Sequence, residues 1–221
     1  NALTVAQVGA LKNTQVSALS TAQVAAFEPA DLAALSAPAI AALTTAQVSN
    51  LTTAQVDALT TAQVAAMEAL DVGALTTQQL VALDAAQVGA LTPAQVLALS
   101  TAKIAAIETA DISGLSTAAV SVLTNTQVAA LATEQVVALS TLQVSKLSAL
   151  QVAALSTVQI RAMALDDIAA LSSAAIVGLT TAQVVKLTTE QIQALSTAQV
   201  AKLAVDDLSV MSSVQIAALE T

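Results

Sequence analysis

The sequence has 221 residues but no cysteine, histidine, tryptophan or tyrosine, and its single aromatic residue is Phe27. Without cysteine it has neither a disulfide framework nor a thiolate metal site. Aromatic side chains supply much of the buried area of an ordinary globular core. The core of this chain must therefore be thin and built from the leucine, valine, isoleucine and alanine that dominate its 56% hydrophobic residues.

Positive charge is also scarce, with six Lys plus Arg against fifteen Asp plus Glu and a formal net charge of −9. Because nucleic-acid affinity depends on basic residues, we expect no nucleic-acid partner. Polar residues recur every few positions, so no apolar run approaches the roughly eighteen residues of a membrane span. We therefore expect no membrane insertion.

What the sequence does have is an eight-residue repeat. A large apolar residue stands at every eighth position from Leu3 to Leu219, in unbroken register. Taking this residue as position 1, position 6 is always Val, Ile or Leu, and the consensus octad is Leu-Ser/Thr-Thr-Ala-Gln-Val-Ala-Ala, seen nearly pure in residues 43–66. We interpret residues 1–221 as a single octapeptide array and, since neither end has an obvious polar capping unit, as an excerpt of a longer one.

Two architectures fit this period poorly. In one continuous helix, eight residues overshoot two turns by roughly 80°, so the apolar stripe would wind around the rod and no partner helix could follow it. A β-solenoid stays open as an alternative, although alanine and glutamine are poor strand formers and positions 1 and 6 would point to opposite faces.

The boundary signals favour a short helix that restarts in every octad. Ser or Thr at position 2 followed by Gln at position 5 is the capping box, in which the hydroxyl accepts from the N3 amide and the Gln side chain accepts from the N-cap amide. The predicted cap pairs include Ser20 with Gln23, Thr52 with Gln55, Thr60 with Gln63, and Ser196 with Gln199. All three prolines fall at position 3 or 4 and all five glycines at position 7 or 8, which is the asymmetry of helix starts and ends.

The sequence therefore predicts an all-α solenoid with one capped helix per octad, over positions 3 to 8. Such helices are too short to be stable alone, so we expect positions 1 and 6, with small residues at position 4, to form a continuous core between neighbouring units. Position 7 and part of position 8 are expected to face solvent.

A longer period overlies the octads. Acidic variants begin at Phe27, Met67 and Ile107, 40 residues apart, and again at Met163 and Leu203, also 40 apart. The gap of 56 between the two sets indicates an in-phase insertion of two octads, over residues 139–154. A five-octad superperiod of this kind is explained either by duplication alone or by one superhelical turn per five octads.

The acidic octads supply the only candidate metal ligands. Ca²⁺ takes six to eight oxygen ligands, and the candidate calcium residues are Glu28, Asp31, Glu68, Asp71, Glu108 and Asp111. The competing interpretation is that acidic residues in a first helical turn are favoured by the helix dipole. No cofactor is expected.

Catalysis is not expected either. General acid–base and nucleophilic catalysis need an activated group beside a base, and capping already explains the many Ser and Thr residues. A threonine ladder could in principle match ice, but Ser and Thr interchange freely at position 2. Met67, Met163 and Met211 occupy the leucine position and are interpreted as core residues.

Octads such as residues 59–66 and 195–202 resemble the octapeptide arrays of long, repetitive, adhesin-like bacterial proteins. The resemblance implies a structural role as a rod, stalk or filament, at the cell surface or secreted, with self-association laterally or end to end. The alternative is an α-solenoid that binds a protein partner on its concave face, in the cytoplasm or as a secreted effector. Lys146, Lys186 and Lys202 would then mark the binding region.

Overall fold

The computed structural model describes residues 3–219, and within that range the chain forms 27 short α-helices and no strands. Each helix has four to six residues and corresponds to one octad. The all-α solenoid with one helix per octad is therefore confirmed. None of the helices in this range is long and apolar enough to cross a membrane.

The chain divides into two compact units, residues 1–119 and 120–221. In unit 1 the helices are α1 (Val5–Gly9), α2 (Asn13–Ser17), α3 (Thr21–Ala25), α4 (Pro29–Ala34), α5 (Ala37–Ala41), α6 (Thr45–Ser49), α7 (Thr53–Asp57), α8 (Thr61–Ala66), α9 (Ala69–Ala74), α10 (Thr77–Val81), α11 (Ala85–Ala90), α12 (Pro93–Ala98), α13 (Thr101–Ala106) and α14 (Thr109–Ile112). The boundary falls within α15 (Thr117–Val122).

In unit 2 the helices are α16 (Asn125–Ala130), α17 (Thr133–Ala138), α18 (Thr141–Val144), α19 (Ala149–Ala154), α20 (Thr157–Ala162), α21 (Leu165–Ala170), α22 (Ser173–Ile176), α23 (Thr181–Val184), α24 (Thr189–Gln193), α25 (Thr197–Val200), α26 (Val205–Val210) and α27 (Ser213–Ala218). The octad register continues through the boundary, from Leu115 to Leu123.

Local sequence explains where each helix starts. The residue at position 2 is extended, as in Ser36 with φ −65° and ψ 151°, and the helix begins at position 3. Pro29 and Pro93 are the first residues of α4 and α12, and Pro38 is the second residue of α5. The placement of the prolines in the first turn is therefore confirmed, since their missing N–H would have no helical partner there.

The glycines lie in or just after the last turn of a helix, as expected, but their backbone is not left-handed. Left-handed backbone at a helix end favours glycine, but no residue in the described range has a positive φ. Instead, the backbones of different octads come close. A Cβ on Gly178 would lie 1.9 Å from the carbonyl oxygen of Ala149, so this position in unit 2 has no room for a side chain.

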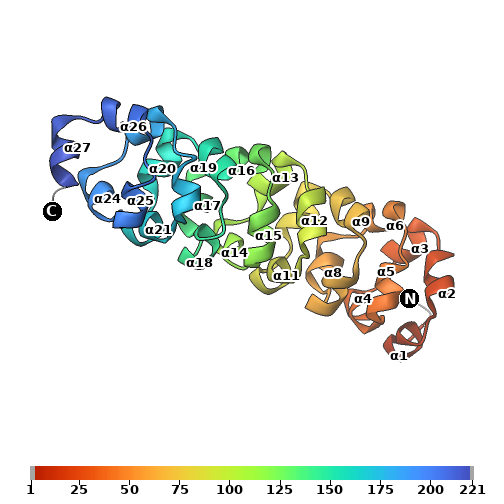
Figure 1. The fold of residues 1–221 in the computed structure, drawn as a ribbon. Helices are drawn as coiled ribbons and strands as arrows, with labels where there is room; N and C mark the ends of the chain where they lie inside the picture. The colour runs from red at the N-terminus through yellow and green to blue at the C-terminus, as the bar shows by residue number, and fades with distance from the viewer. Residues whose placement is uncertain (1–2, 220–221) are drawn as a thin grey trace. The chain divides into compact units, whose positions relative to one another are not determined.

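Within each unit, a helix packs against the third helix along the chain. Examples are α1 with α4, α5 with α8 and α9 with α12 in unit 1, and α16 with α19 and α24 with α27 in unit 2 (Figure 1). The chain therefore comes back beside itself after three to four octads. Of the two explanations for the 40-residue period, one superhelical turn per five octads is wrong, because octads five apart are not the ones that stack. Duplication alone is the explanation that stays.

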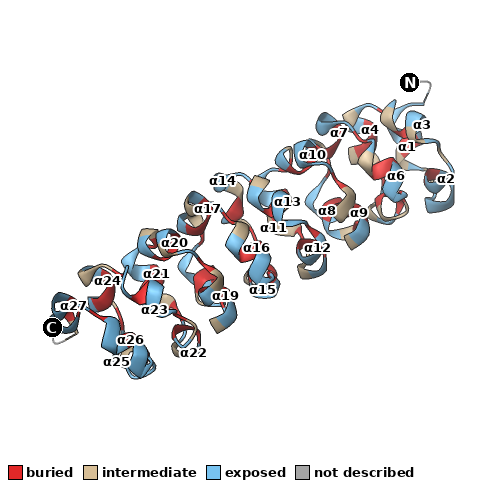
Figure 2. Cartoon of the chain, turned by 90° about the horizontal axis from the view of Figure 1, so that it is seen from above, coloured by how far each residue is buried: buried red, intermediate tan, exposed pale blue. Residues whose placement is uncertain are grey.

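The core consists of positions 1, 5 and 6. Position 6 is almost completely buried from Val8 to Ile192, as in Val56 and Val152 at 0% exposure, and position 1 is buried from Phe27 to Leu195. Figure 2 shows these buried residues recurring along each short helix beside exposed ones. Position 7 is exposed or partly exposed, as expected.

The assignment of position 4 to the core is wrong. Alanine at this position is exposed, and so are the large residues found there, such as Leu70 and Leu142 at 76% and 71% exposure. Its place is taken by the glutamine of position 5, which is buried to between 1% and 6% exposure at every octad from Gln47 to Gln215 that carries it. A polar residue thus lies in the core of each unit.

Candidate functional site

The buried glutamine at position 5 forms two sets of hydrogen bonds, and the first set lies within its own octad. In α7 the hydroxyl of Thr52 accepts from the N–H of Gln55 at 3.1 Å, while the Oε1 atom of Gln55 accepts from the N–H of Thr52 at 2.8 Å. This is a complete capping box. The same pair of hydrogen bonds is present at Ser20 with Gln23, at Thr60 with Gln63 and at Ser196 with Gln199.

The second half reaches across to another octad. The Nε2 atom of Gln55 donates to the carbonyl oxygens of Val24 at 3.0 Å and of Phe27 at 2.8 Å, which lie 31 and 28 residues earlier. Val24 lies in the last turn of α3, where its carbonyl also accepts from the N–H of Phe27 at 3.1 Å, and Phe27 lies two residues beyond the end of the helix. One side chain therefore joins the start of α7 to the end of α3, and we call this two-sided contact the glutamine clamp.

The clamp recurs with the same geometry in both units. Its Nε2 atom lies 2.5–3.0 Å from the carbonyl oxygen 28 residues earlier at Gln47, Gln55, Gln63, Gln79, Gln87, Gln95, Gln151, Gln159, Gln183, Gln191, Gln199 and Gln215. A row of buried amides thus binds each turn of a unit to the turn before it. Because every amide has partners on both sides, its burial carries no desolvation penalty of an unpaired group.

The sequence contained a signal for this clamp. A capping box accepts Glu as well as Gln at N3, yet position 5 is never Glu in this chain. Glutamate supplies the same acceptor but has no N–H. The selection of Gln over Glu indicates that a donor is needed as well as an acceptor. Lys103, which replaces Gln in α13, also keeps a donor, and its Nζ atom donates to the carbonyl of Gly73.

Aspartate replaces glutamine in the acidic octads. Asp31, Asp71, Asp167 and Asp207 are 2–5% exposed. Asp31 takes over the local half of the contact, since its Oδ2 atom accepts from the N–H of Glu28 at 3.0 Å. Asp71 accepts instead from the hydroxyl of Thr45, 26 residues earlier, at 2.7 Å.

Burial changes the ionisation of two position-5 aspartates, the buried Asp167 and the partly exposed Asp111. It raises the pKa of Asp167, and the neighbouring Asp166 raises it further, while a hydrogen bond from the N–H of Ala164 opposes the shift. The pKa of Asp111 is also raised, first by burial and then by the carboxylates of Glu108 and Asp84. Removal from water disfavours the charged form of a carboxyl group.

The calcium candidates are distributed between two structural roles. Glu28, Glu68 and Glu108 lie exposed at N-cap positions, and Asp31, Asp71 and Asp111 lie at N3. Across residues 3–219, no three acidic side chains come close enough together to hold a metal ion. The paired carboxylates thus occupy the two capping positions that Ser/Thr and Gln occupy elsewhere.

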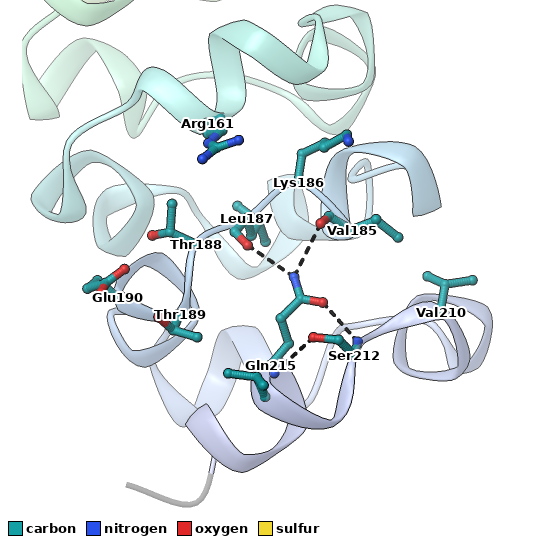
Figure 3. Close-up of a pocket in the computed structure, with 11 residues that line it drawn as sticks. Arg161, Val185, Lys186, Leu187, Thr188, Thr189, Glu190, Val210, Ser212 and Gln215 are labelled. Carbon is teal, nitrogen blue, oxygen red and sulfur yellow. Dashed lines mark hydrogen bonds between the residues drawn. The ribbon is translucent and has the colours of Figure 1, made fainter.

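One surface groove combines positive charge with apolar side chains. It has a volume of about 600 Å³ and lies in unit 2, where Arg161, Lys186, Val185 and Val210 line it (Figure 3). Glu190 lies on the same groove, and the pKa of this carboxyl is lowered by hydrogen bonds from its own N–H and from the hydroxyls of Thr188 and Thr189.

The clamp of Gln215 forms part of the wall of this groove. Its amide nitrogen bridges to the carbonyl oxygens of Val185 and Leu187, and its oxygen accepts from the N–H of Ser212, as Figure 3 shows. Of the three lysines singled out from the sequence, Lys186 lines the groove, whereas Lys146 and Lys202 do not. The positive charge of the groove therefore comes from Arg161 and Lys186.

Comparison with known proteins supports the repeat. A family model described as the ALTTAQ repeat matches residues 24–61, 64–101, 104–141 and 160–197. The matches begin 40, 40 and 56 residues apart, which reproduces the 40-residue period and the in-phase insertion. The six letters correspond to positions 8, 1, 2, 3, 4 and 5, so they include both residues of the capping box. No curated protein matches the sequence.

Proposed function

This chain belongs to the ALTTAQ repeat family, and from that premise we propose that it is a non-enzymatic structural scaffold, a stalk or spacer that holds other parts of a larger assembly apart. The observation that carries the proposal is the glutamine clamp. The same buried contact recurs turn after turn, so within residues 3–219 the repeated chemistry of the octad serves to hold the repeat together.

The clamp also accounts for tolerance to changes in length. Its partners lie 28 and 31 residues back, so a whole octad can be inserted without altering the pattern of position-5 donors and the acceptors at positions 6 and 1. The two extra octads at residues 139–154 fit this requirement. A spacer whose length varies in steps of one octad is the role that such a structure serves best.

Small-angle X-ray scattering tests the proposal. A 221-residue globule has a radius of gyration of about 17 Å, and we expect the chain to exceed this clearly. Deleting residues 139–154 should shorten the molecule and keep its helical circular dichroism. Deleting residues 139–150 instead shifts the later octads by half a repeat, so it should disrupt the clamps and lower stability. A radius close to the globular value would overturn the spacer role.

The resemblance to adhesin-like octapeptide arrays supports a scaffold that is displayed at the cell surface or secreted. Immunolabelling of intact against permeabilised cells tests it. Labelling only after permeabilisation would contradict the surface location and favour the cytoplasmic alternative.

A second candidate function is recognition of an acidic protein segment, favoured by the groove that Arg161 and Lys186 line in an otherwise acidic chain. We expect a glutamate-rich peptide to bind with an affinity that falls with added salt and is lost on Arg161→Glu with Lys186→Glu. Lys146→Glu with Lys202→Glu changes the charge equally, at exposed residues of unit 2 that do not line the groove, and serves as the control. Equal binding by both double variants would rule the groove out.

A further inference from the structure

The turn that carries α13, α14 and α15 has no glutamine clamp to the turn before it. Position 5 is Lys103 in α13, Asp111 in α14 and Ala119 in α15, and no other three successive octads lack glutamine there. A glutamine at either of the last two positions would donate to carbonyls 28 and 31 residues earlier, as Gln55 does. Within residues 3–219 these carbonyls accept from no side chain, and they belong to Leu80, Leu83, Val88 and Leu91.

The clamps of the preceding turn are complete. Gln79, Gln87 and Gln95 donate to the carbonyls 28 residues earlier at 2.7, 2.5 and 2.7 Å. Of the three position-5 side chains in the next turn, only that of Lys103 donates a hydrogen bond to the turn before it, at the carbonyl of Gly73. We call the contact of α13, α14 and Ala119 with residues 72–91 the unclamped seam, and all of it lies in unit 1.

Two of the three position-5 side chains at the seam are less covered than usual. Lys103 and Asp111 are partly exposed, whereas the glutamines of complete clamps are 1–6% exposed and the aspartates of the other acidic octads 2–5%. Burial and then the carboxylates of Glu108 and Asp84 raise the pKa of Asp111. Asp84 is the N-cap of α11, in the preceding turn. Like charges therefore lie on both sides of the seam and oppose the contact.

The backbones at the seam meet without side chains between them. Helix α11 packs against α14, and a Cβ on Gly89 would lie 2.8 Å from the carbonyl oxygen of Gly114. Neither glycine contributes an apolar side chain to the contact, and glycine also loses more backbone freedom on folding than other residues. Segments with few buried apolar contacts and few hydrogen bonds to their neighbours are the ones that open locally in a folded protein.

We propose that the unclamped seam is the opening point of the scaffold, where the turn of α13 and α14 separates from the turn before it while the clamped turns of unit 1 stay folded. Separation at the seam breaks no glutamine clamp. Separation one turn earlier would break the clamps of Gln79, Gln87 and Gln95 together. A stalk built in this way lengthens under load at one contact before its turns unfold. The inference deepens the scaffold role proposed above and rests on it.

Cysteine labelling tests the opening, because the sequence has no cysteine of its own. Val88 and Val56 are both position-6 valines of unit 1, at 1% and 0% exposure. The carbonyl of Val56 accepts from Gln87 at 3.3 Å, whereas that of Val88 lies at the seam. Val88→Cys and Val56→Cys thus make the same change in an unclamped and a clamped octad. We expect a thiol reagent in native buffer to label Val88→Cys at least about tenfold faster.

Asp111→Gln should hold the seam closed. It returns a donor for the carbonyls of Leu80 and Leu83 and removes a carboxylate near Asp84, so labelling of Val88→Cys should slow at least about tenfold. Labelling of Val56→Cys should stay unchanged. Glu68→Gln is the matched control, since it removes the same charge at an exposed residue whose side chain makes no capping hydrogen bond.

Amide hydrogen exchange on the unmodified chain makes the same comparison without cysteine variants. The N–H of Ile112 donates to Glu108 at 3.1 Å and that of Val56 to Thr52 at 3.0 Å, so the local hydrogen bonds match. We expect faster exchange at Ile112. Equal exchange at the two amides, or equal labelling of the two cysteines, would overturn the seam as the opening point. So would a control Glu68→Gln that slows labelling of Val88→Cys as much as Asp111→Gln does.

Failure of this inference is distinguishable from failure of the scaffold role. A chain whose radius of gyration exceeds that of a globule, but whose two cysteines are labelled alike, keeps the spacer and loses only the opening point. A chain with the radius of a globule defeats the scaffold role whatever the labelling rates.

Discussion

Replacing Gln183 by glutamate is the most direct test of the clamp inside a unit. Gln183 is 1% exposed, its Oε1 atom accepts from the N–H of Thr180 at 2.7 Å, and its Nε2 atom donates to the carbonyls of Val152 at 2.9 Å and Leu155 at 2.6 Å. Glutamate has the same shape and keeps the accepting oxygen. Only the donor to the preceding turn is lost.

The free energy of unfolding should fall by about 2–5 kcal/mol at neutral pH, because a buried polar group left without its partner costs about 1–3 kcal/mol and two carbonyls are affected. The introduced carboxyl should have a raised pKa, since its charged form faces carbonyl oxygens in a buried site. Between the ordinary glutamate pKa and this raised value the folded state binds more protons than the unfolded state. Stability of Gln183→Glu therefore falls as pH rises through that window, and part of it returns in acid.

The assay is urea denaturation followed by far-UV circular dichroism at neutral and acidic pH, with Gln78→Glu as the exposed control, expected to stay within about 0.5 kcal/mol of wild type. Repeat arrays need not unfold in one step, so amide hydrogen exchange around Val152 and Leu155 should be followed as well. The reasoning is refuted if the two variants have the same free energy of unfolding at neutral pH. It is also refuted if the stability lost in Gln183→Glu is as large at acidic pH as at neutral pH.

Two further substitutions probe other features of unit 2. Asp167→Gln restores the length and the donor of the clamp, so we expect stabilisation on the order of 1 kcal/mol by urea denaturation at neutral pH. Burial raises the pKa of Asp167, so its ionisation weakens the fold as pH rises between the ordinary aspartate value and the raised one; this pH dependence should disappear in the glutamine variant. Gly178→Ala should cost about 1–3 kcal/mol by calorimetry, because the new Cβ would lie 1.9 Å from the carbonyl oxygen of Ala149. Gly73→Ala, whose new Cβ would lie 3.1 Å from the carbonyl oxygen of Ala98, should cost clearly less.

The local part of the structure could be predicted from the sequence because its causes lie within one octad. A capping box joins residues three apart, as Ser20 and Gln23 do, and proline at the start of a helix follows from its missing N–H. The alternation of positions 1 and 6 likewise identified most of the core. These features need no knowledge of how the octads are arranged in space.

The hydrogen-bond acceptors of the Nε2 atom of each position-5 glutamine could not be predicted from the octad alone. It lies 28–31 residues back, and an apolar pattern that repeats every eight residues does not encode how many octads make one turn. The 40-residue recurrence from Phe27 to Met67 is a sequence period, whereas stacking is set by helices three apart. The error at position 4 has the same origin, because small size was taken for burial while the larger Gln55 filled the interior.

The direction of the clamp has a consequence for biosynthesis. Every donor follows its acceptors along the chain, as Gln183 follows Val152 and Leu155. During translation a new octad thus finds its hydrogen-bond acceptors already made and can dock on the turn before it, residue by residue from the N-terminus. Because the sequence separation of these contacts does not grow with chain length, relative contact order falls as octads are added, and a longer array should fold with no added topological delay.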